Sequence, residues 1–155
     1  MDDASDLTPL DPAYLKVMRL RALIPAAVLL AGATVLEFAQ FNPGGLFLIP
    51  AALLAALLVY YIPPRRFARW GYRLDPDLLR IVRGRLFHSD TVVPLGRVQH
   101  VDVDQGPIAR RYGLAMLTVH TAGNANASVS LPGLRHADAL AMREAIGARI
   151  RRGGA

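Results

Sequence analysis

Three alternating residues, His100, Asp102 and Asp104, carry the imidazole and carboxylate groups that could bind a metal ion or move a proton. In an extended strand, side chains two positions apart point to the same face, at a separation of roughly 7 Å. One strand therefore rarely completes the ligand shell of a metal unless a neighbouring strand adds residues. We interpret these three side chains as a solvated polar face and predict no metal site.

The remaining sequence shows no pattern typical of catalysis. His88, His120 and His136 complete the four histidines, and none belongs to a series of serine, histidine and acid with a recognisable nucleophile turn. No glycine-rich loop has the spacing that cradles phosphates. The chain has no cysteine, which excludes disulfides and thiolate metal sites. These features predict a protein that is not an enzyme and uses no cofactor.

Arginine supplies nearly all of the positive charge of this 155-residue chain, whose formal net charge is +6 and whose only lysine is Lys16. A basic chain could bind nucleic acid, anionic lipid or an acidic partner. Because several arginines flank apolar segments, we expect contact with the membrane surface and none with nucleic acid. The candidate contacts with anionic lipid or with a partner are Arg65, Arg66, Arg69, Arg110 and Arg111.

A wider set of arginines could form an anion-binding surface, because guanidinium groups suit phosphate oxygens. This set is Arg80, Arg83, Arg85, Arg97, Arg110 and Arg111. The alternative, which we favour, is scattered charge with a general attraction to anionic lipid. Arg110 and Arg111 follow the Gly106-Pro107 break in a predicted loop, so they are the first choice for a contact.

Two apolar segments lie within the first 62 residues, at 22–41 and 45–62. About 20 helical residues span about 30 Å, the thickness of a hydrocarbon core. Asn42-Pro43-Gly44 predicts a tight turn, so the two segments run antiparallel. We therefore predict a transmembrane hairpin over residues 22–62, after an N-terminal tail over residues 1–21.

Other interpretations of the apolar segments fit less well. A cleaved signal peptide would begin nearer the N-terminus and carry a small-residue cleavage site, and a helical hairpin in a soluble core would keep a polar stripe. Glu37 is either a functional acid within the membrane or a solvated carboxylate at its interface, and we favour the latter. We place Pro25 in the first turn of its helix and expect Pro50 to kink the second helix.

Basic residues flank both outer ends of the predicted hairpin and are missing from its turn. The positive-inside rule then places both termini in the cytoplasm, as in a multi-pass protein of the inner (plasma) membrane. Pro63-Pro64 is expected to end the second helix, so residues 63–69 are predicted to form a basic linker. The flanking residues are Lys16, Arg19, Arg21, Arg65, Arg66 and Arg69.

From Trp70 the hydrophobic pattern changes to period two, which predicts short strands without an intervening helix and hence an antiparallel sheet. A final helix is expected over residues 136–151, where Ala139, Met142 and Ile146 form an apolar stripe. The expected strands lie at residues 71–75, 78–84, 85–95, 97–105, 114–121 and 128–131, with a hairpin turn at 123–126.

Short antiparallel strands followed by one amphipathic helix are the outline of a pleckstrin-homology-like (PH-like) fold, and particular residues make the resemblance more specific. They are Tyr72-x-Leu74, Arg83-Gly84, Pro94-Leu95-x-Arg97-Val98-Gln99-x-Val101, Gln105-Gly106-Pro107-Ile108-x-Arg110-x-x-Gly113-Leu114, Thr121-Ala122-Gly123 and Gly133-Leu134. In this series the chain resembles the bacterial PH-domain proteins of the YdbS type, whose two-span hairpin is also similar.

The resemblance implies an α+β protein in which a two-helix transmembrane hairpin precedes a PH-like antiparallel β sandwich or barrel, capped by a C-terminal α-helix. The PH-like domain would cover residues 70–152 and face the cytoplasm. We expect a membrane-anchored interaction or assembly module whose partner is a membrane protein or a second copy of the chain. The alternative is a sensor that binds an anionic lipid headgroup or a small ligand.

Overall fold

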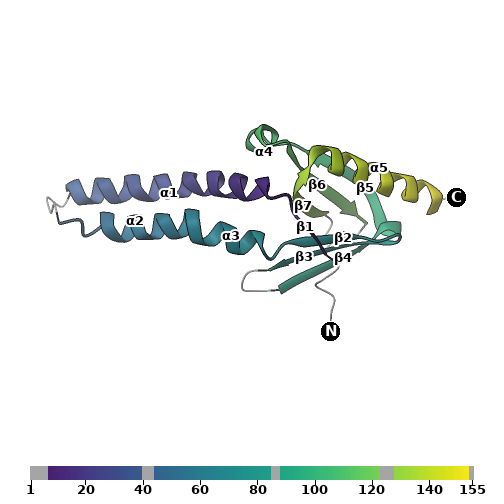
Figure 1. Ribbon diagram of the computed structural model, residues 1–155, viewed down its shortest axis with the longest axis horizontal. Coiled ribbons are helices and arrows are strands. Elements are labelled where there is room, and N and C mark those ends of the chain that lie inside the picture. Colours follow the sequence, from purple (N-terminus) through teal and green to yellow (C-terminus); the bar gives the residue numbers. More distant parts are fainter. Residues whose placement is uncertain (1–6, 40–43, 85–87, 123–127, 154–155) are drawn as a thin grey trace. The chain divides into compact units, whose positions relative to one another are not determined.

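The computed structural model describes residues 7–39, 44–84, 88–122 and 128–153 (Figure 1). The chain divides into two compact units. Leu15–Phe67 form a helical unit, whereas the described parts of Met1–Tyr14 and Ala68–Ala155 form a sheet unit. The helical unit is therefore an insertion in the sequence of the sheet unit.

The helical unit is an antiparallel pair. Helix α1 spans Ala13–Ala39, and the return segment consists of α2 (Leu48–Ala56), the π-helical turn η1 (Leu57–Tyr61) and α3 (Ile62–Phe67). Both α1 and the continuous run Leu48–Phe67 are long and apolar enough to cross a membrane. The two helices pack through the buried side chains of Ala26, Ala55 and Val59.

The prolines of this unit lie differently from the predictions. Pro25 is inside α1, because that helix begins at Ala13, whereas Pro50 lies in the first turn of α2, where its missing N–H costs no helical bond. Pro63 and Pro64 do not end the helix, which continues to Phe67. The π turn before them, in which the Ile62 N–H donates to the Leu57 carbonyl, adds room for the proline rings.

The sheet unit contains two antiparallel sheets, in the orders β1-β2-β3-β4 and β5-β6-β7. The predicted strands at 78–84 and 114–121 are confirmed to the residue, and the others differ by a few residues at their ends. The first sheet consists of Thr8–Pro9, Gly71–Leu74, Leu78–Gly84 and His88–Pro94. The second consists of Val98–Asp104, Leu114–Thr121 and Ser128–Arg135.

Side chains from both sheets and from the last helix form one core. Leu79 and Ile81 of β3, Leu117 of β6 and Leu131 of β7 are fully buried, as is Ile146 of α5. Helix α5 (His136–Gly153) packs on β5, β6 and β7 (Figure 1), as the predicted apolar stripe requires. The PH-like sandwich with its C-terminal helix is thus confirmed.

Three features of the sheet unit depart from the predicted series of strands. The predicted tail over residues 1–21 contributes β1, which pairs with β2, and the beginning of α1. A short helix, α4 (Pro107–Arg111), separates β5 from β6, so the expectation of no intervening helix is wrong. A 3₁₀ turn, η2 (Leu95–Arg97), joins β4 to β5. Residues 40–43, 85–87 and 123–127, which include most of both predicted turns, lie outside the described residues.

The N-terminal segment is fastened to the end of β7. The Asp11 N–H donates to the Gly133 carbonyl at 3.1 Å, and Arg135 Nε donates to Asp11 Oδ2 at 2.7 Å. The hydrogen bond from Arg135 lowers the pKa of Asp11 below its ordinary value of 3.8. A lowered carboxyl pKa means that this contribution to stability is present above pH 3.8 and is lost as the pH falls through the lowered value.

Gly133 is a position at which alanine should be strongly destabilising. Its φ is +75°, and a Cβ atom there would lie 2.5 Å from Tyr14 Cγ. Gly113 is the matched control, because its φ is +67° but a Cβ atom would meet nothing within 4 Å. Backbone strain alone should cost Gly113→Ala about 1–2 kcal/mol of unfolding free energy.

We expect Gly133→Ala to cost clearly more than Gly113→Ala, because the collision with Tyr14 adds to the same strain. Chemical unfolding of both full-length variants in detergent micelles measures the difference. Equal losses would contradict the packing of the N-terminal segment over β7.

Candidate functional site

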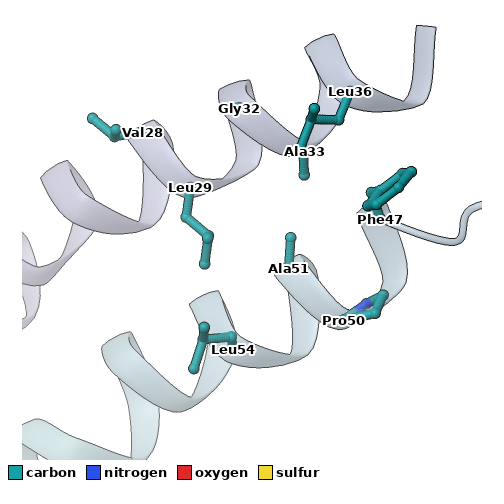
Figure 2. A pocket seen from close by; sticks show the side chains of 9 residues that line it. All are labelled: Val28, Leu29, Gly32, Ala33, Leu36, Phe47, Pro50, Ala51 and Leu54. Atoms are coloured by element: carbon teal, nitrogen blue, oxygen red, sulfur yellow. The ribbon is translucent and has the colours of Figure 1, made fainter. Parts of the chain in front are cut away.

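An apolar groove runs between the two helices of the hairpin, with a volume of about 490 Å³ (Figure 2). Gly32 and Ala33 of α1 and Ala51 of α2 line it together with larger apolar side chains. A Cβ atom on Gly32 would meet nothing within 4 Å, so the groove is open at that point. Small residues on a membrane helix allow a second helix to approach closely.

Glu37 holds the start of α2 against α1, at the end of the hairpin where the groove lies. Its side chain is buried, at 7% exposure, and its two oxygens accept hydrogen bonds from the N–H groups of Gly45 at 2.6 Å and Phe47 at 2.9 Å. Phe47 is the N-cap of α2, so the carboxylate satisfies unpaired N–H groups where the helix dipole favours negative charge. The preference for a solvated carboxylate at Glu37 is therefore wrong, because these amides enclose it.

The arginines that follow the second apolar segment lie mainly on a helix rather than in a linker. Arg65 and Arg66 form the last turn of α3, where cations suit the helix dipole, and both are exposed. The Arg65 guanidinium lies 3.8 Å from the centroid of the Tyr61 ring, a cation–π contact. Arg69, also exposed, follows the helix.

Arg110 and Arg111 lie at the end of α4, not in a loop. Gly106 caps this helix, Pro107 begins it, and Gly113 follows its end with a left-handed backbone. Both arginines are exposed, and α4 has no acidic residue. No carboxylate in the described part of the chain pairs with either of them. The short helix thus presents two guanidinium groups between β5 and β6.

The wider set of arginines does not gather on one strand face. Arg80 donates to both carboxylate oxygens of Asp90, a hydrogen bond that raises the pKa of the guanidinium further. Arg83, three residues along β3, points to the opposite face. Arg97 lies on η2, and Arg85 lies outside the described residues.

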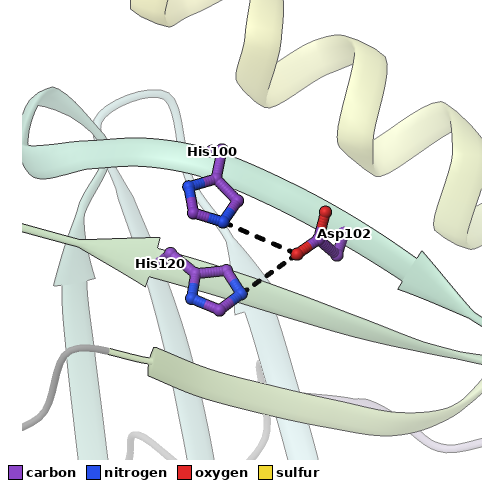
Figure 3. A group of neighbouring side chains, drawn as sticks. All are labelled: His100, Asp102 and His120. Carbon is purple, nitrogen blue, oxygen red and sulfur yellow. Dashed lines mark ion pairs between the residues drawn. The ribbon is translucent and has the colours of Figure 1, made fainter.

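In the structure, His120 lies beside the predicted polar face on β5, which the sequence pattern did not predict. Val101 and Val103 are more buried than their neighbours, so His100, Asp102 and Asp104 alternate outward as predicted. His120 of β6 lies beside His100 and Asp102 (Figure 3), whereas Asp104 does not join them. His120 joins the cluster because the register of β5 and β6 places it opposite His100. The sequence does not indicate this register, since α4 separates the two strands.

Comparison with known proteins covers most of the hairpin sequence and of the sheet unit. A family model described as "Bacterial PH domain" matches residues 19–150. The "UPF0699 transmembrane protein YdbS" of Bacillus subtilis (strain 168) is 32% identical over 143 residues, which cover 88% of each chain. No solved structure matches the chain.

Replacement of Glu37 by alanine should loosen the hairpin end, because the N–H groups of Gly45 and Phe47 lose their acceptors. We expect the midpoint of thermal unfolding in detergent micelles to fall by several degrees for Glu37→Ala and by less for Glu37→Gln, which keeps one acceptor oxygen. Phe38→Ala is the matched control, because that neighbour is 77% exposed. A shift no larger than that of Phe38→Ala would show that the carboxylate does not hold the turn.

Proposed function

Since the chain belongs to the bacterial PH domain family, we propose that it is a non-enzymatic membrane protein that works as an interaction or assembly module at the cytoplasmic face of the membrane. The observation that carries the proposal is the open apolar groove on the membrane hairpin, whose lining includes the small residues Gly32, Ala33 and Ala51. This groove gives the anchor a surface for another helix, and the sheet unit adds a folded domain outside the apolar segments.

The orientation rests on the placement of the basic residues. Lys16, Arg19 and Arg21 are exposed on the first turns of α1, and Arg65 and Arg66 are exposed at the end of α3. By the positive-inside rule, these ends of the hairpin face the cytoplasm. The sheet unit, whose sequence lies on both sides of the hairpin, then lies in the cytoplasm too, which a reporter fused after Ala155 would test.

A partner within the membrane suits the composition of the groove. In the most apolar stretch of each helix, few residues are buried against the rest of the chain. The buried share is 17% in α1 and 22% in the return helix Leu48–Phe67. Lipid can cover an outward apolar surface, whereas Gly32 and Ala33 leave space into which another helix could pack. Packing at small residues is a main source of helix association in membranes. We therefore place the partner, a membrane protein or a second copy of the chain, against Gly32.

A single cysteine at Gly32 should capture this partner, because the natural chain has no cysteine and the position has open space. We expect Gly32→Cys, treated in native membranes with a photoactivatable maleimide, to give one defined crosslinked band. Twice the mass of the chain would identify a second copy, and another mass would identify a different membrane protein.

Val35→Cys is the matched control, because Val35 is 67% exposed on the same helix and does not line the groove. It should give no such band. Equal capture from both positions, or capture of lipid alone at Gly32, would remove the support for a helix partner in the groove.

A second candidate function, the binding of an anionic lipid headgroup, is supported by the exposed pair on α4. The double variant Arg110→Ala/Arg111→Ala of the full chain in micelles should bind short-chain phosphatidylglycerol several-fold more weakly. The control Arg83→Ala/Arg97→Ala removes the same charge from other exposed positions. If both double variants lose affinity equally, the attraction is a property of net charge rather than of α4.

A further inference from the structure

Two histidines and a carboxylate converge on the outer face of the second sheet. His100 of β5 lies directly opposite His120 of β6, and their rings stack with centroids 4.1 Å apart and planes within 11°. Asp102 Oδ2 lies 3.6 Å from His100 Nε2 and 3.1 Å from His120 Nε2 (Figure 3). One potential ligand atom from each residue thus lies within 4.8 Å of the other two.

We propose that His100, Asp102 and His120 bind a divalent transition-metal ion of the zinc class. Zinc binds histidine nitrogen and carboxylate oxygen at about 2.0–2.2 Å, which places neighbouring ligands of a tetrahedral site about 3.3 Å apart. The two distances from Asp102 lie on either side of this value. The two stacked rings would have to tilt toward each other for three ligand atoms to point at one ion, and the exposed side chain of His100 has room to turn.

The choice of metal follows from the ligand types. Imidazole nitrogen suits zinc, nickel and copper better than magnesium or calcium, which prefer sets of oxygen ligands. Two histidines and one carboxylate leave a coordination position open, as in accessible zinc sites rather than closed structural ones. The exposure of the side chains of His100 (59%) and Asp102 (54%) gives an ion a direct path from solvent.

The strands that carry the three ligands are fixed by buried side chains and by a contact between neighbouring strands. Leu117 and Val119, which alternate with His120 on β6, are fully buried in the core. Thr118, between them and opposite Asp102, lies within hydrogen-bond distance of Ser130 on β7, at 3.3 Å. Bound metal would join the edge strand β5 to the central strand β6 and so stabilise the folded sheet.

Charges near the site come from β5 and α5. His100 also lines a groove between these elements that contains Arg143, Glu144 and Arg151. Asp104 adds a further carboxylate on the same face of β5. The two carboxylates beyond the site offset the two arginines, so the net field does not exclude a cation.

The test uses the full chain, purified in detergent without a polyhistidine tag and stripped of metal by a chelator. We expect titration with Zn²⁺ against a chromogenic competitor to show one saturable site per chain. Co²⁺ should replace Zn²⁺ and give the intense visible absorption of a four- or five-coordinate ion. Weak absorption of a six-coordinate aqueous ion, or no saturation by Zn²⁺, would overturn the proposal without the use of any variant.

Matched variants locate the site. His120→Ala and Asp102→Asn should each raise the Kd for Zn²⁺ by at least tenfold, since loss of a ligand costs no less than loss of the groups that orient one. His136→Ala and Asp104→Asn remove the same groups from exposed positions outside the cluster and should change the Kd much less, the latter only through the loss of a nearby charge. Equal weakening in a control and its matched variant would overturn the assignment. A cooperative unfolding transition, measured for each variant in the presence of chelator, confirms that the variant is folded without metal.

Discussion

In the hydrocarbon interior of a membrane, each peptide N–H and C=O group needs a partner from the protein, and this requirement organises the helical unit. Regular helices meet it except at helix ends and prolines. At the start of α2, Glu37 supplies the acceptors. Before Pro63, the π turn changes the donor–acceptor spacing, so the chain passes two prolines while it remains helical. Because the backbone groups find partners locally, no polar side chain is needed along the rest of the hairpin, and the groove can be lined by apolar residues.

The sheet unit is closed by residues from both sides of the hairpin in the sequence. β1 precedes α1, yet it pairs with β2, which follows α3. Asp11 adds a hydrogen bond and an ion pair to the end of β7, and Tyr14 packs over Gly133. These contacts have high sequence separation, so their formation costs loop-closure entropy. The PH-like sandwich is therefore completed by residues that precede the hairpin in the sequence as well as by residues that follow it.

Much of this architecture could be predicted from the sequence, and the misses have physical causes. The strands at 78–84 and 114–121 were predictable because apolar residues recur within clear glycine or turn boundaries. β1 has two residues and no periodicity, so only its partner reveals it. Helix α4 is too short to show a helical pattern, and Gly106-Pro107 indicates a break as readily as a helix start. The contact of His120 with Asp102 depends on strand register, a property of the folded sheet.

The charged residues of the sheet unit differ in whether an ion partner within the chain already compensates their charge. Three carboxylates form ion pairs with arginines: Asp11, Asp75 and Asp90. Because a guanidinium group stays protonated at physiological pH, the charge of each carboxylate is already compensated. Asp102 instead faces two imidazoles, whose ring nitrogens are ligands that a transition metal accepts. On α4, arginines have no acidic neighbour within the helix. The proposed cation site on the outer face of β5–β6 and the proposed anion contact at the end of α4 therefore lie on different elements.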